Sequence, residues 1–110
     1  MNSYSKFTDL QINELVATRL KKKCLLTEES VLAYMDSGYR TFDPCNNPAD
    51  AMPIIIENGI AIRPYKTATP VAFNAEIGEF YGHSVYNENV LRAAMELFLL
   101  MKDEENSNGN

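Results

Sequence analysis

One segment concentrates the side chains of this sequence that could do chemistry. Between Phe42 and Gly59 the chain reads FDPCNNPADAMPIIIENG. Its candidate ligand-binding residues are Asp43, Cys45, Asn46, Asn47 and Asp50. Carboxylate and amide oxygens suit a hard cation, but the segment lacks the alternating ligands and the central glycine of a calcium loop. We therefore predict no metal site here.

Catalysis would need a second group close to the cysteine. The only histidine is His83, and nothing in the sequence brings Cys45 and His83 together as a nucleophile and its base. Cys24 and Cys45 lie 21 residues apart, which does not match the spacing of zinc ligands. We predict no catalytic residue, no metal and no cofactor, and we lean toward a protein that is not an enzyme.

The same segment can be explained as the start of a helix. Asn47 is a good N-cap, Pro48 fits the first helical position, and Asp50 in the first turn is favoured by the helix dipole. Cys45 would then fill a small apolar site. We prefer this structural interpretation to a binding site, because each residue already has a local role.

A nucleotide or another small ligand is the alternative occupant of this segment. The N–H groups at a helix start can hold a phosphate, and Tyr39, Phe42 or Tyr81 could stack on a base. The carboxylates of Asp43 and Asp50 oppose an anion, and no glycine-rich cradle is present.

Size and charge limit the classes of function. A chain of 110 residues suits a single domain. The net charge of −5 opposes direct binding to nucleic acid, which needs a basic face. The lysines at 21–23 form the only basic cluster, and we expect them to complement the dipole at a helix end. The first residues are polar and no apolar run is long enough to cross a bilayer, so we predict a cytoplasmic protein with no membrane contact and with reduced thiols.

Periodicity predicts the elements around the segment. Thr8 and Gln11 form a capping box at the start of a helix from about residue 9 to about residue 22. Residues 24–26 should return the chain to the core. Residues 27–38 are either a short helix or, as we prefer, part of a hairpin that pairs 31–35 with 39–42 and places Gly38 at the positive-φ turn position.

The second half of the chain predicts both helices and strands. Pro53 should kink a helix that starts at Asn47 or divide it in two, the isoleucines 54–56 should be buried on more than one side, and Gly59 should end it. Strands are expected at 60–65 and 71–77, residues 78–86 are irregular, and a last helix is capped by Asn89 or Asn87. We predict one α+β domain over residues 1–105, with about three helices packed on an antiparallel sheet of three to four strands. A flexible tail follows at 106–110.

Three stretches carry a resemblance to a known family. FTDLQINELVA, FDPCNNPADAMPIIIENGIAI and NENVLRAAMELFLLMKDEEN resemble the NinX-like family of small phage and prophage proteins, a domain family of unknown function. The chain departs from the family pattern at Met52, where a tryptophan is usual, and at Val90, where a proline is usual. The resemblance implies a phage-encoded protein made in an infected bacterium. It assigns no catalytic residues.

The favoured functional prediction is a non-enzymatic accessory protein that binds a host or phage protein, with inhibition of a host defence as one such role. The acidic C-terminal third could compete for basic surfaces that normally hold nucleic acid. A homodimer is a further expectation, because the last helix has a wide apolar face.

Overall fold

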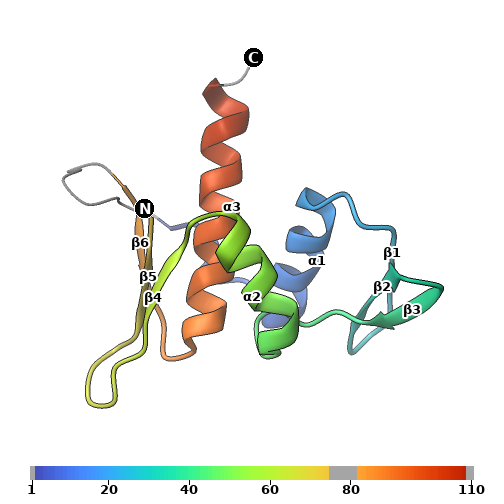
Figure 1. Cartoon of the computed structure of the whole chain (residues 1–110), viewed down its shortest axis with the longest axis horizontal. Helices are drawn as coiled ribbons and strands as arrows, with labels where there is room; N and C mark the ends of the chain where they lie inside the picture. Colours follow the sequence, from blue (N-terminus) through green and yellow to red (C-terminus); the bar gives the residue numbers. More distant parts are fainter. Residues whose placement is uncertain (1, 75–81, 109–110) are drawn as a thin grey trace.

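The computed structural model describes residues 2–74 and 82–108 (Figure 1). Within these residues the elements follow in the order α1 (Asp9–Arg19), β1 (Cys24–Leu26), β2 (Val31–Met35), β3 (Gly38–Thr41), α2 (Pro48–Glu57), β4 (Ala61–Arg63), β5 (Val71–Phe73), β6 (Ser84–Tyr86) and α3 (Val90–Asn108). The strands form two antiparallel sheets, β1-β2-β3 and β4-β5-β6. The α+β class is confirmed, although the strands make two small sheets where we expected one.

Local signals set the first helix. The Thr8 hydroxyl accepts from the Gln11 N–H, and the Gln11 side chain accepts from the Thr8 N–H, so the predicted capping box is present. The helix ends earlier than expected. Lys21 has φ of 59°, and the N–H groups of Lys21 and Lys22 donate to the carbonyls of Thr18 and Ala17. This is the Schellman ending, with a lysine where glycine is usual.

The hairpin interpretation of residues 27–42 is confirmed, since β2 pairs with β3 through a two-residue turn. The positive φ falls on Asp36, at 58°, and not on Gly38 as predicted. A second expectation was wrong. Cys24 packs against the core, but Leu25 and Leu26 are about half exposed. Leu25 points to the face opposite Cys24, and Leu26 is the last residue of β1, the free edge strand of this sheet.

The second helix starts as predicted and runs on through its proline. Asn47 caps it, and Pro53 lies inside a continuous element, so a division into two helices is excluded. Of the three isoleucines, Ile54 and Ile55 are buried, whereas Ile56 is 71% exposed. We expected all three to be covered. Gly59 ends the helix with φ of 64°.

The second sheet confirms that the predicted strands at 60–65 and 71–77 are antiparallel neighbours, as β4 and β5. Residues 75–77 of the longer predicted strand lie outside the described residues. The strand β6 was missed, because residues 78–86 lack a clear alternation and β6 becomes recognisable only by its pairing with β5.

The long helix α3 is the centre of the molecule (Figure 1). It contacts the second sheet on one side and α1 and α2 on the other, and the first sheet joins this body through contacts of β1 and β2 with α1. Asn89 is its cap, since the side-chain oxygen accepts from the N–H groups of Leu91 and Arg92. The helix continues to Asn108, beyond the expected end, and the flexibility of residues 106–110 stays a prediction. No helix in the described part of the chain is long and apolar enough to span a bilayer.

Candidate functional site

The segment Asp43–Asp50 forms a tight turn that packs against all three helices. The Asp43 carbonyl accepts from the N–H groups of Asn46 and Asn47 at 3.0 and 2.7 Å. The Asp43 N–H donates to the Asp50 carboxylate at 2.9 Å. Asn47 accepts from the Ala49 N–H at 3.0 Å and so caps its own helix. These bonds are local and follow from the turn and cap chemistry of the residues.

The first helix holds the turn through one buried amide. The Asn13 side chain is almost wholly buried, and its amide donates to an Asp43 carboxylate oxygen at 2.7 Å. Its oxygen accepts from the Cys45 N–H at 3.1 Å. A buried polar side chain is costly unless it is bonded, and here both ends of the amide have partners.

The last helix holds the other side of the turn. The Asn89 amide donates to the Cys45 carbonyl at 2.7 Å and to the Asn46 side-chain oxygen at 3.0 Å. The Asn46 amide in turn donates to the carboxylates of Asp9 and Asp43 at 3.2 Å. Asn89 therefore caps α3 and fastens it to the turn with the same side chain.

Below the turn lies an ionic cluster that the sequence analysis missed. The Arg92 guanidinium donates to Glu96 at 2.6 Å and to Asp9 at 2.7 Å. It also donates to the carbonyls of Tyr4 and Phe7 at 3.1 and 2.7 Å. Burial alone would lower the pKa of Arg92, but the bonds to Asp9 and Glu96 outweigh it and raise the pKa. The signal in the sequence was an arginine and a glutamate four residues apart within an otherwise apolar helix face.

Cys45 is a packing residue in this arrangement. Its side chain is completely buried, and its thiol lies 3.8 Å from the Asp9 carbonyl. Burial, assisted by the nearby Asp9 carboxylate, raises the pKa of the thiol to about 12. A reactive cysteine needs a lowered pKa, so this thiol is inert at neutral pH. His83 pairs with Glu104 on α3 and not with Cys45.

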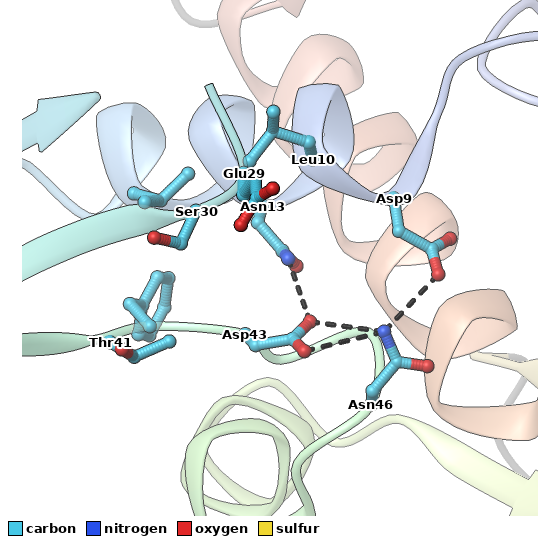
Figure 2. A pocket seen from close by; sticks show the side chains of 10 residues that line it. Asp9, Leu10, Asn13, Glu29, Ser30, Thr41, Asp43 and Asn46 are labelled. Carbon is cyan, nitrogen blue, oxygen red and sulfur yellow. Dashed lines mark hydrogen bonds between the residues drawn. The ribbon is translucent and has the colours of Figure 1, made fainter. Parts of the chain in front are cut away.

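A cavity of about 170 Å³ opens between α1, the first sheet and the turn (Figure 2). It is lined by Asp9, Leu10, Asn13, Glu29, Ser30, Val31, Thr41, Phe42, Asp43 and Asn46. Three of these residues are acidic and none is basic, so the wall is a poor match for a phosphate. No group of three or more metal-ligating side chains is assembled for an ion within residues 2–74 and 82–108.

The structure gives the five candidate residues different environments. Asp43 and Asn46 reach the wall of the cavity, and Figure 2 shows their side chains bonded to each other. Cys45 is buried, Asn47 caps α2, and Asp50 binds the Asp43 backbone. Among the proposed stacking residues, Phe42 is buried and Tyr81 lies outside the described residues.

The first sheet exposes an apolar surface that the sequence analysis missed. In this antiparallel sheet Leu25 pairs with Leu32, and Tyr34 pairs with Tyr39. Residues opposite each other share a face, so these four side chains form one surface, which we call the outer face. Leu25, Tyr34 and Tyr39 are exposed at 51%, 47% and 37%. The other face carries Val31 and Ala33, which are buried.

Both faces of β2 are therefore apolar, and this was the feature of the sequence that could have indicated the outer face. Val31, Leu32, Ala33, Tyr34 and Met35 form an unbroken apolar run, whereas a strand with one solvated face normally alternates with polar residues. The run predicted a strand but could not indicate which of its faces the rest of the protein covers.

Comparison with known proteins gives the family of the chain. No curated protein sequence matches it. The sequence profile of the family described as "Bacteriophage P22, NinX" matches residues 3–102, which include α1, both sheets and most of α3. This match confirms the resemblance carried by the three stretches. The chain therefore belongs to the NinX family of phage proteins.

Proposed function

We propose that this phage protein acts in the cytoplasm of the infected bacterium as a small accessory protein that binds another protein. The observation that carries the proposal is the outer face of the first sheet. Three large apolar side chains are exposed side by side there, and two of them are tyrosines, which are enriched in protein interfaces. Single exposed apolar residues are ordinary, but a contiguous group is typical of an interaction site.

The charges of the last helix favour the sheet over the acidic C-terminal third as the binding surface. Ion pairs on its last turns join Asp103 to Arg19 and Glu105 to Lys102, and Glu104 contacts the His83 ring. The carboxylates of Asp103 and Glu105 are therefore already partly neutralised within the chain. They are less able to imitate nucleic acid than their number in the sequence suggested.

The cavity favours protein binding over the small-ligand alternative. Pockets for small molecules usually measure about 300–1,000 Å³ and are mainly apolar. The cavity at the turn measures about 170 Å³, and its polar groups are largely bonded to one another. A second cavity of about 380 Å³ lies beside Phe42 and the start of α2, but Asp50, the one candidate residue that lines it, already accepts from the Asp43 N–H.

The test is capture of a partner by tagged protein from phage-infected cells, with identification by mass spectrometry. The binding variant is Tyr34→Ser with Tyr39→Ser. The matched control is Tyr65→Ser with Tyr86→Ser, which removes two exposed tyrosines near the second sheet. We expect one protein to be retained by the wild type and by the control and lost by the binding variant. Equal capture by all three, or no specific capture, would refute the proposal. A host defence protein among the captured partners would support that role.

A further inference from the structure

We propose that the outer face and the neighbouring exposed lysines Lys21 and Lys23 together bind an acidic, amphipathic segment of the partner protein. This inference rests on the proposed function and adds the chemistry of the partner. Apolar side chains of the segment would pack on Leu25, Leu32, Tyr34 and Tyr39. Its carboxylates would pair with the lysines.

Lys23 lies at one end of the outer face, whereas the Lys22 ammonium lies 5.5 Å from the centre of the buried Phe42 ring. Lys23 immediately precedes β1, and its carbonyl accepts from the Tyr34 N–H at 2.9 Å, which places it beside the tyrosine pair. Its ammonium lies 5.9 Å from the centre of the Tyr34 ring. The Tyr34 and Tyr39 rings contact edge to face, with their centres 5.3 Å apart. Aromatic and cationic groups therefore form one continuous surface.

The positive charge at this end is not neutralised within the described part of the chain. No carboxylate there lies within salt-bridge distance of Lys21, Lys22 or Lys23, and Lys21 and Lys23 are exposed. The nearest acidic group in the hairpin turn, Asp36, faces Arg40 at 3.7 Å. The complementary ligand is therefore negatively charged, although the whole chain is acidic.

The opposite end of the sheet has the opposite charge. Glu28 and Glu29 lie in the connection between β1 and β2, and both are exposed. The outer face is thus positive beside Tyr34 and Tyr39, apolar at Leu25 and negative beyond it. A bound segment should carry its carboxylates at one end, and this polarity gives the complex a direction.

A protein segment fits this surface better than single-stranded nucleic acid. Binding of single strands uses open aromatic faces for base stacking within a basic groove. Here the Lys23 ammonium lies over the Tyr34 ring, and the Tyr34 and Tyr39 rings contact edge to face. The exposed Leu25 on the edge strand β1 and the two glutamates at the end of the face also suit an apolar, charged peptide.

The test uses defined probes and nuclear magnetic resonance titration of the full chain. The first probe is an amphipathic helical peptide with leucines along one face and glutamates clustered at one end. The comparison probes are the same peptide with lysine for every glutamate, a glutamate peptide without leucine, and oligothymidine. We expect the acidic amphipathic peptide to shift the amides of β1, β2 and β3, and to bind about ten-fold more tightly than each of the others.

Variants test whether the peptide binds through the lysines beside the outer face. Lys21→Glu with Lys23→Glu should reverse the preference, so that the lysine peptide binds more tightly. Lys6→Glu with Lys66→Glu makes the same change in net charge at exposed sites elsewhere and should leave the preference unchanged. All these residues are exposed, and circular dichroism would verify that each variant is folded.

The outcomes separate this inference from the proposed function. Equal binding of the acidic and basic peptides, tighter binding of oligothymidine, or self-association that covers the outer face would refute the acidic segment. If capture from infected cells still requires Tyr34 and Tyr39 in that case, the proposed function stands with a partner of different chemistry. If the acidic peptide is not preferred and capture from infected cells does not require Tyr34 and Tyr39, both proposals are refuted.

Discussion

Replacing Arg92 by methionine removes the one cation of the buried ionic cluster while keeping most of the apolar volume. Glu96 is 1% exposed and would keep a single side-chain partner, the Asn2 amide. The carbonyls of Tyr4 and Phe7 would lose the donor that both share. The N-terminal residues would therefore lose their main polar attachment to α3.

The expected loss of stability follows from the buried Glu96 carboxylate, which remains without its cation. Removing one partner of a buried ion pair destabilises a protein by about 3–5 kcal/mol, because the other charge stays buried without compensation. A domain of ordinary stability unfolds with about 5–15 kcal/mol. The substitution should thus remove at least about a fifth of the stability.

Urea unfolding followed by circular dichroism measures this loss, since the chain has no tryptophan to report by fluorescence. The matched control is Arg19→Met, which breaks the partly exposed pair with Asp103 and should cost less than about 1 kcal/mol. The double variant Arg92→Met with Glu96→Met should be more stable than the single variant, because no buried charge is then left alone. If Arg92→Met costs no more than Arg19→Met, the buried cluster does not stabilise the fold as described.

Three further predictions concern single side chains. The raised pKa of Cys45 predicts pH dependence: an unfolded thiol ionises near pH 8.5, so the stability from this group is present below that pH and is lost toward pH 12. In urea unfolding above pH 9, the wild type should therefore lose up to about 1.4 kcal/mol per pH unit more than Cys45→Ala, and parallel curves would contradict this. Lys21→Gly should raise the midpoint of thermal unfolding, because the left-handed conformation costs a lysine about 1 kcal/mol; an unchanged or lower midpoint would count against strain at this site. Asn89→Ala should cost more in urea unfolding than Asn47→Ala, for which about 1 kcal/mol is expected, since Asn89 caps a helix and also bonds the Cys45 carbonyl; equal losses would show that this bridge adds nothing.

The candidate site shows why side-chain chemistry alone was ambiguous. Asp43 and Asn46 could equally serve a ligand or a turn, because each offers only oxygens and an amide. The partners that decide between these roles come from residues 30 or more positions away, such as Asn13 and Asn89. No pattern within the segment could indicate that these amides would occupy the groups that a ligand would need.

The sequence by itself determined the features that depend on neighbours within about four residues. The capping box at Thr8, the helix start at Asn47 and the end at Gly59 all satisfy backbone groups of their own turns, so local residue types were enough. The matching stretches along the chain likewise carried the family.

Only the tertiary structure decided which apolar side chains are covered. Leu25 and Ile56 look like core residues in the sequence, yet both are exposed, whereas the charged Glu96 is buried. Burial depends on what packs against a surface from distant parts of the chain, and an apolar residue carries no mark of its future neighbour. The outer face of the first sheet is apolar in the sequence and uncovered in the fold, and only their combination indicates a binding surface.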